Sequence, residues 1–237
     1  MTVRRSARRH HSAPTRAFSL LGEFFVTLSV IMALFLVYRI WWTNIEADRQ
    51  SQTTAAAIRG DWAQRDEGAE QHQSRTAPGI GFLHIPALGE PGEIAIVEGT
   101  DPKRLNEGVA GYYTAPVRAS MPWDREGNFS LAAHRDGHGA KFHNLDKMRA
   151  GDHIVVETQH DWYIYTVFST LPKTTDSNVG VIDPVPKGSG RYTRGQYITL
   201  TTCTPVLSSD YRLVVWGELT RVDPVTSDRS RPAELRR

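Results

Sequence analysis

Hydrophobic positions divide this chain into one long apolar run and a body of short apolar stretches. The run covers residues 18–42, and only Glu23 near its start and Arg39 near its end carry charge. At about 1.5 Å per residue, a helix of this length crosses a hydrocarbon core of about 30 Å. Trp41 and Trp42 supply the aromatic residues typical of a membrane interface. The pattern therefore predicts a transmembrane helix.

The body has seven stretches with the alternation and residue types of β-strands, separated by Gly, Pro, Asn and Asp. They are residues 81–87, 93–98, 128–135, 153–158, 161–172, 196–203 and 211–219. Short helices are expected at Asp101–Gly108, where Asp101 is the N-cap and Pro102 the first helical residue, and at Ala140–Arg149. Many short strands at this spacing predict one closed or sandwiched all-β domain over residues 80–220.

The segments around this domain differ in charge. Residues 1–17 contain five arginines and no acid, whereas acids follow directly after the apolar run. By the positive-inside rule, the N-terminus is cytosolic and the remainder extracytoplasmic, at the cell membrane. A cleaved signal peptide is the disfavoured alternative, because the run is long and no small-residue cleavage site follows it at once. Residues 43–79 are expected to form a stalk or a helix lying on the domain, and residues 221–237 a disordered tail.

Composition narrows the functional classes. The chain has 237 residues and a net charge of +2, and the arginines at its start leave the body net acidic. A nucleic-acid-binding domain needs a clustered basic surface, so this class is disfavoured. The single cysteine, Cys203, excludes an intramolecular disulfide and a multi-thiolate zinc site.

Strand alternation brings three reactive side chains to one end of the predicted sheet. In residues 196–203, Cys203 lies on the polar face at the end of the strand. The short connector 204–210 is typical of antiparallel neighbours, so Arg212 is expected near Cys203. His134 ends another strand, on the face opposite its apolar residues.

These three groups permit acyl transfer through a thioester. A thiolate attacks an amide carbonyl, an imidazole protonates the leaving amine, and a fixed cation stabilises the oxyanion. A group that orients the imidazole is not evident. The spacing alone leaves open a structural role for each residue. It also leaves open a zinc site, for which the ligands would be His134, His138, His143 and Cys203.

Longer motifs add a family resemblance. Residues 199–203 read TLTTC and match the TLxTC motif of sortases, the extracytoplasmic cysteine transpeptidases of Gram-positive bacteria. Arg212 follows at the sortase spacing, and residues 128–135 (NFSLAAHR) resemble the segment that ends in Ala-Gly-His-Arg. The resemblance covers about residues 80–220, and three separated motifs in this order are highly specific.

The finer pattern is most similar to class E sortases of actinobacteria. The matching segments are residues 97–102 (VEGTDP), 111–113 (GYY), 139–145 (GAKFHNL) and 199–205 (TLTTCTP). In that class, a Tyr after Gly-His is associated with a preference for LAxTG over LPxTG sorting signals. Tyr113 is the best match here, although residues 110–113 (AGYY) depart from that pattern.

The resemblance implies a closed eight-stranded β-barrel and cleavage of a C-terminal LAxTG/LPxTG-type signal between Thr and Gly. Cys203 would be the nucleophile, His134 the acid and base, and Arg212 the oxyanion or substrate-positioning group. The acyl group would pass to the amine of a peptidoglycan precursor, lipid II. We expect no cofactor and no metal. Candidate substrate-binding residues are Tyr113, Thr201 and Thr202.

Two alternative functions are each disfavoured by specific features of the sequence. A catalytically idle module would bind sorting signals without cleaving them, and the intact Cys203, His134 and Arg212 disfavour it. A class C-like sortase would polymerise pilins. The Asp61-Trp62 pair lacks the proline of that class's lid motif, and no apolar segment follows Leu219, so this alternative is also disfavoured.

Overall fold

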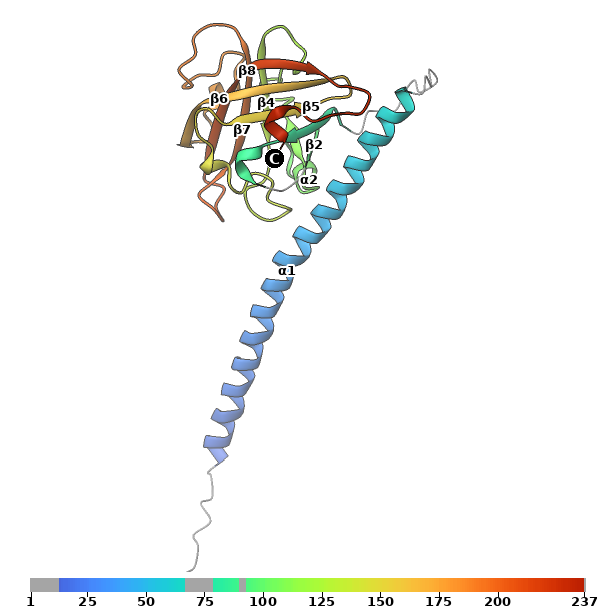
Figure 1. Cartoon of the computed structure of the whole chain (residues 1–237). Helices are drawn as coiled ribbons and strands as arrows, with labels where there is room; N and C mark the ends of the chain where they lie inside the picture. The colour runs from blue at the N-terminus through green and yellow to red at the C-terminus, as the bar shows by residue number, and fades with distance from the viewer. Residues whose placement is uncertain (1–12, 67–78, 90–92, 237) are drawn as a thin grey trace, which may run out of the picture. The chain divides into compact units, whose positions relative to one another are not determined.

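The structure is a computed structural model that describes residues 13–66, 79–89 and 93–236. Its central feature is a closed β-barrel with the strand order β1-β2-β3-β4-β7-β8-β6-β5 (Figure 1). The strands are β1 Gly81–His84, β2 Ile94–Glu98, β3 Ala110–Tyr112, β4 Gly127–Ala132, β5 His153–Glu157, β6 Asp161–Thr174, β7 Gln196–Thr204 and β8 Tyr211–Pro224. The prediction of a closed eight-stranded barrel is confirmed.

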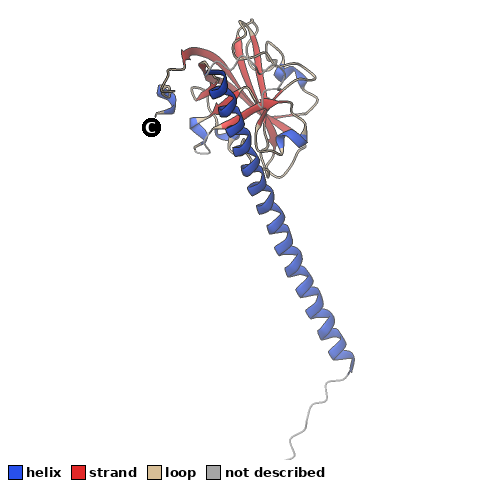
Figure 2. Cartoon of the chain, turned by 90° about the vertical axis from the view of Figure 1, so that its right-hand side faces the viewer, coloured by secondary structure: helices blue, strands red, loops and turns tan. Residues whose placement is uncertain are grey.

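The seven predicted strands all occur in the barrel, and β3 is the eighth. It has three residues, which is too short to show a period in the sequence. The barrel interior holds one large apolar cluster that includes Phe129, Leu131, Ile198, Leu200 and Val215. Only short helical elements lie in the connections between strands (Figure 2).

One of the two predicted short helices forms. Helix α2 is Pro102–Leu105, and the carboxylate of its N-cap Asp101 accepts the Arg104 N–H at 3.2 Å. The prediction of a helix over residues 140–149 is wrong, because this segment consists of turns and one 3₁₀ turn, Leu145–Lys147. Its helix-like apolar spacing arises because Phe142 and Leu145 both enter the barrel core from these turns.

Helix α1 runs over Ala13–Asp66. A stretch of it that begins at Leu20 is long and apolar enough to cross a membrane. The basic N-terminus that orients it lies largely outside the described residues, so the orientation stays a prediction. From Thr43 onward the helix belongs to the same compact unit as the barrel. Ile58 and Trp62 pack there in an apolar cluster with four barrel residues: Phe82, Ala95, Val97 and Val109. The sequence predicts two alternatives here, a stalk or a helix lying on the domain. For residues 43–66, the structure has the helix lying on the domain.

The C-terminal segment is also folded against the barrel. Strand β8 continues to Pro224, and Val225 and Leu235 pack on a small apolar cluster on the barrel exterior. The Arg229 guanidinium donates to the Glu157 carboxylate at 2.8 Å. The expected disorder of residues 221–237 therefore does not describe this segment. Its contacts come from isolated side chains, which leave no apolar period in the sequence.

Glu157 joins helix α1, the barrel and the C-terminal segment. Its side chain is 2% exposed and accepts from Arg59 at 2.9 Å and from Arg229 at 2.8 Å, and His84 Nε2 lies 3.1 Å away. Burial would raise the pKa of this carboxyl, but hydrogen bonds from His84, Arg59 and Arg229 outweigh burial and lower the pKa to about 2. The ionised form is therefore the form that the fold stabilises.

We expect Glu157→Gln to lower the free energy of unfolding at pH 7 by about 2–3 kcal/mol. The value is modest for a buried ion pair, because the Arg59 and Arg229 side chains are 34% and 31% exposed. The wild-type advantage should be full above pH 4.5 and shrink as pH falls toward 2, since folding depresses this pKa. Urea unfolding at pH 7 and pH 3 measures both effects. Glu93→Gln is the control and should cost less, because the Glu93 side chain is 34% exposed in its ion pair with Arg59, whereas Glu157 is 2% exposed. An equal cost at both pH values would contradict the account.

Candidate active site

The three predicted reactive residues lie at the same end of three neighbouring strands: Cys203 on β7, Arg212 on β8, and His134 two residues beyond β4. Strands β4 and β7 are parallel with a constant register in which Ala132 pairs with Thr201. The Ala133 N–H still donates to the Thr201 carbonyl at 3.4 Å, and the register continued by two residues places His134 opposite Cys203. Cys203 is the direct partner of Arg212 in the antiparallel pair β7–β8. Neighbouring strands are about 4.8 Å apart, so the backbones of the three residues are adjacent at this edge of the barrel.

All three residues lie on the outer face of the barrel, as the strand alternation predicts. The apolar residues that alternate with them, Leu200 on β7 and Leu213 on β8, are buried in the interior cluster. Cys203, His134 and Arg212 are each half-buried. A thiol at the end of a strand and on the outer face is accessible to an extended peptide.

His134 has a partner that the sequence analysis missed. Its Nε2 atom lies 2.7 Å from Oδ1 of Asn106, the residue that follows helix α2. This contact orients the imidazole through Nε2. The other ring nitrogen, Nδ1, takes no part in the contact with Asn106. The signal in the sequence is weak, because an Asn at the end of a short capped helix usually serves as a cap itself.

The environment of His134 disfavours its charged form. Burial is the main cause that lowers the pKa of His134, and the neighbouring His138, whose ring centroid is 5.3 Å away, lowers it further. The Asp136 carboxylate acts in the opposite direction. The imidazole is therefore poised to lose a proton more readily than an exposed histidine.

We expect two neutralising variants to move the pKa of His134 in opposite directions. His138→Asn should raise it, because the second imidazole no longer opposes a positive charge, and Asn tolerates the positive φ of 45° at this position. Asp136→Asn should lower it further, because a stabilising negative charge is lost. An NMR titration of the His134 ring measures both shifts. A shift of the same sign in both variants would exclude this electrostatic account.

Arg135 links the segment that follows β4 to the end of β7. Its guanidinium, in a residue that is 5% exposed, donates to the Thr204 hydroxyl at 2.8 Å and pairs with Asp146 at 3.0 Å. It also reaches the Cys203 carbonyl at 3.5 Å. This buried charge therefore helps to hold β7 in place at Cys203 and Thr204.

Arg212 is held by the backbone of the β7–β8 connection. Its guanidinium donates to the carbonyls of Ser209 at 2.8 Å and Tyr211 at 3.1 Å. None of the ion pairs among the described residues includes Arg212. Its positive charge is therefore available to a substrate oxygen.

Tyr113 reaches the same site from the connection after β3. Its hydroxyl lies 2.8 Å from the Thr201 hydroxyl, and burial raises the pKa of the phenol, which is close enough to Arg212 and Cys203 to feel their charge. A cavity of about 70 Å³ lies beside it, between β7, β8 and the β6–β7 connection. Its lining includes Tyr113, Pro116, Val179, Ile182, Thr201 and Arg212.

The two candidate threonines differ in position. Thr201 lines this cavity, and its hydroxyl donates to the Leu131 carbonyl at 3.1 Å. Thr202 alternates to the other face of β7, where it is 3% exposed and donates to the Ala133 carbonyl at 2.8 Å. The structure therefore brings Tyr113 and Thr201 to the site and turns Thr202 away from it.

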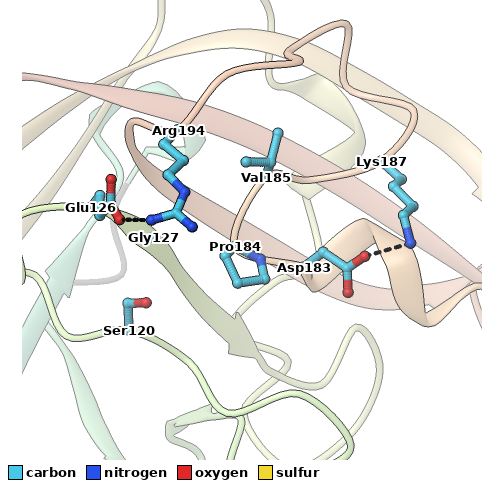
Figure 3. Close-up of a pocket in the computed structure, with 8 residues that line it drawn as sticks. All are labelled: Ser120, Glu126, Gly127, Asp183, Pro184, Val185, Lys187 and Arg194. Carbon is cyan, nitrogen blue, oxygen red and sulfur yellow. Dashed lines mark hydrogen bonds and ion pairs between the residues drawn. The ribbon is translucent and has the colours of Figure 1, made fainter.

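A larger cavity of about 560 Å³ lies at the other end of β4 and β7, where Gly127 pairs with Gln196 (Figure 3). Two ion pairs, Glu126–Arg194 and Asp183–Lys187, line it. Cys203 follows seven residues along β7. The candidate reactive residues therefore lie apart from this cavity, and none of them lines it.

The described residues do not form the zinc site left open by the sequence. Among them, the group of potential ligands close enough to share an ion is His84, Glu93 and Glu157. Two arginines, Arg59 and Arg229, already neutralise Glu157 there. His143 of the zinc alternative instead directs Nδ1 at the Arg135 carbonyl, 2.9 Å away.

Comparison with known proteins identifies the family. A family model described as the sortase domain matches residues 83–220. The chain belongs to the sortase family. Sortase SrtE2 of Streptomyces coelicolor is 52% identical to this sortase, over 98% of this chain and 93% of that protein. Sortase SrtE1 of the same organism is 43% identical, over 94% of this chain and 63% of that protein.

Solved structures agree with this assignment. The crystal structure of sortase E1 from Streptomyces coelicolor, with a tripeptide in the active site, has a TM-score of 0.62 and 44% identity. It covers 66% of this sortase, and this sortase covers 96% of that chain. Sortase E from Streptomyces avermitilis has a TM-score of 0.57 and 36% identity over 67% of this chain and 97% of that chain. This sortase is therefore a transpeptidase most similar to class E sortases.

Proposed function

We propose that this sortase cleaves a C-terminal LAxTG/LPxTG-type sorting signal between Thr and Gly through a Cys203 thioester. The acyl group then passes to the amine of a cell-wall peptidoglycan precursor. The observation that carries the proposal is that Cys203 and Arg212 are paired on β7 and β8 and that His134 follows two residues after the neighbouring strand β4. A related sortase E1 holds a tripeptide in its active site, which supports a peptide substrate here.

The proposed first step forms one bond and breaks one. The Cys203 thiolate attacks the Thr carbonyl carbon, and the Arg212 guanidinium stabilises the oxyanion that forms. When the C–N bond breaks, protonated His134 gives its proton to the Gly amine. Because Nε2 faces Asn106 Oδ1, we assign the transferred proton to Nδ1.

The second step reverses these roles. The incoming amine loses a proton to His134 as it attacks the thioester carbonyl, and the Cys203 thiolate leaves. The product is a new amide, and both side chains return to their starting states. No cofactor or metal takes part.

The proposed location is the outer surface of the cell membrane, with the N-terminus in the cytosol. The apolar stretch of α1 supports an anchor, and the arginines before it support this orientation. Sorting-signal proteins and lipid-linked precursors would then meet the barrel at the membrane surface.

Tyr113 and Thr201 are the residues proposed to contact the signal. Tyr113 lines the small cavity next to Arg212, and its hydroxyl is tied to Thr201. The side chain at the second position of the signal is Ala or Pro, and the hydroxyl contact with Thr201 fixes the Tyr113 ring as a rigid wall that can distinguish the two. Thr202 is not included, since it lies on the face of β7 opposite to Thr201 and does not line this cavity.

The test is incubation of the full-length protein in detergent with LAxTG and LPxTG peptides and a primary amine, with products identified by mass spectrometry. We expect cleavage between Thr and Gly, a thioester adduct on Cys203 and a ligated product with the amine. Tyr113→Phe, which removes only the hydroxyl, should change the ratio of kcat/KM for the two peptides by about 3–10-fold. Tyr192→Phe, at an exposed tyrosine, is the control. The function is refuted if neither peptide gives an adduct or cleavage.

A further inference from the structure

The turn that follows His134 has an unusual backbone. Residues 137–140 all have positive φ angles, with values of 61°, 45°, 76° and 39°. Two of these residues, His138 and Ala140, are not glycine, and L side chains rarely adopt this conformation. Such a backbone persists where the surrounding structure holds it. The Phe142 N–H donates back to the His134 carbonyl at 3.0 Å, so the turn also borders His134 directly.

Helix α1 supplies part of that support. The side-chain oxygen of Asn44 accepts the Gly139 N–H at 3.0 Å. One helical turn later, the Asp48 carboxylate pairs with Lys141 Nζ at 3.1 Å, and the Lys141 side chain is 10% exposed. Two side chains of the helix therefore contact the turn at Gly139 and at Lys141, one on each side of Ala140.

The same part of α1 also packs against the loop that contains Asn106. Ala47 lies between Asn44 and Asp48 on the helix and is 1% exposed. A Cβ atom added to Gly108 would lie 2.8 Å from the Ala47 carbonyl oxygen, so Gly108 lies tightly against the helix backbone. Gly108 is two residues from Asn106, which orients His134. Residues 44–48 thus touch both segments that set the position of the imidazole.

We propose that Asn44 and Asp48 are positioning residues for His134, so that the helical segment directly after the apolar stretch forms part of the catalytic apparatus. This inference rests on the proposed function. The side chains of Asn44 and Asp48 act through the 137–141 turn and contact neither the substrate nor the reacting atoms. Their effect should therefore appear in the chemical step and not in peptide binding.

The experiment uses full-length protein in detergent, with Asn44→Ala and Asp48→Ala as test variants. We expect each to lower kcat about 3–10-fold and to change KM for the peptide less than about twofold, because a displaced acid slows reaction of the bound substrate. Asn44→Asp keeps an acceptor for the Gly139 N–H and should restore most of kcat. Gln52→Ala, at an exposed position of the same helix, should behave as wild type.

Amide hydrogen exchange provides a readout that does not require activity. Residues 137–141 should exchange faster in Asn44→Ala than in Gln52→Ala, while the β7 amides should be unchanged. Wild-type kcat in both test variants, or an effect on KM alone, would overturn the proposal. Failure of the wild type to cleave any sorting peptide would instead refute the proposed function, and faster exchange in that case would leave the structural coupling intact.

Discussion

Replacing Cys203 with alanine is expected to lower kcat/KM for the cleaved sorting peptide by at least about 10³-fold and to abolish the thioester adduct. Cys203 is the chain's only cysteine, so another thiol cannot substitute for it. The remaining groups of the site can still bind and polarise a peptide, but water attacks amides slowly. The loss should therefore fall almost entirely on kcat.

Stability measurements distinguish loss of the nucleophile from loss of the folded structure. The Cys203 side chain points outward and is half-buried, so Cys203→Ala should leave the melting temperature within a few degrees of wild type. Ser208→Ala, in the β7–β8 connection, is the matched control and should retain full activity. Mass spectrometry of the trapped enzyme and initial rates provide the measurements. Undiminished cleavage by Cys203→Ala would require a different nucleophile.

Replacing His134 with alanine is expected to lower kcat by about 10²–10⁴-fold, the range for loss of a general acid and base. Both chemical steps suffer, because the leaving amine lacks a proton donor and the incoming amine lacks an acceptor. Arg212 remains opposite Cys203 in this variant, so peptide binding should change much less than turnover.

A comparison among the histidines isolates this role. His138 lies 5.3 Å from His134 between ring centroids, and His143 directs its imidazole at the Arg135 carbonyl. His143→Ala should therefore retain most of the activity. Single-turnover kinetics would measure the slow acylation expected of His134→Ala. Equal rates in His134→Ala and wild type would remove His134 from the mechanism.

Much of the fold was accessible from local patterns. The strands were predictable because their side chains alternate between a packed interior and the outside, and α2 because Asp101 and Pro102 define a helix start. The 140–149 segment was misassigned because Phe142 and Leu145 have helical spacing while the backbone between them turns. The C-terminal segment was misjudged because the contacts that hold Val225, Leu235 and Arg229 against the barrel are with residues distant in the sequence.

The same distinction between local sequence patterns and contacts of distant residues applies to the candidate active site. Alternation along the predicted strands sufficed to put Cys203, Arg212 and His134 at strand ends and off the core, and the family motifs added the role expected of each. Their direct juxtaposition depends on the parallel β4–β7 register, which joins segments almost 70 residues apart. The partner of His134 is likewise remote, because Asn106 approaches from the loop after α2.

The sequence by itself determined the apolar segment, the strand-rich body, the sortase motifs and the choice of Cys203, His134 and Arg212 as the proposed reactive residues. These features depend on local period and residue type, which the chain carries directly. Only the tertiary structure decided that Asn106 orients His134, that Thr202 faces inward, and that residues 44–48 of α1 brace the turn after His134. Each of these depends on barrel closure and helix packing, which bring together groups that no local pattern relates.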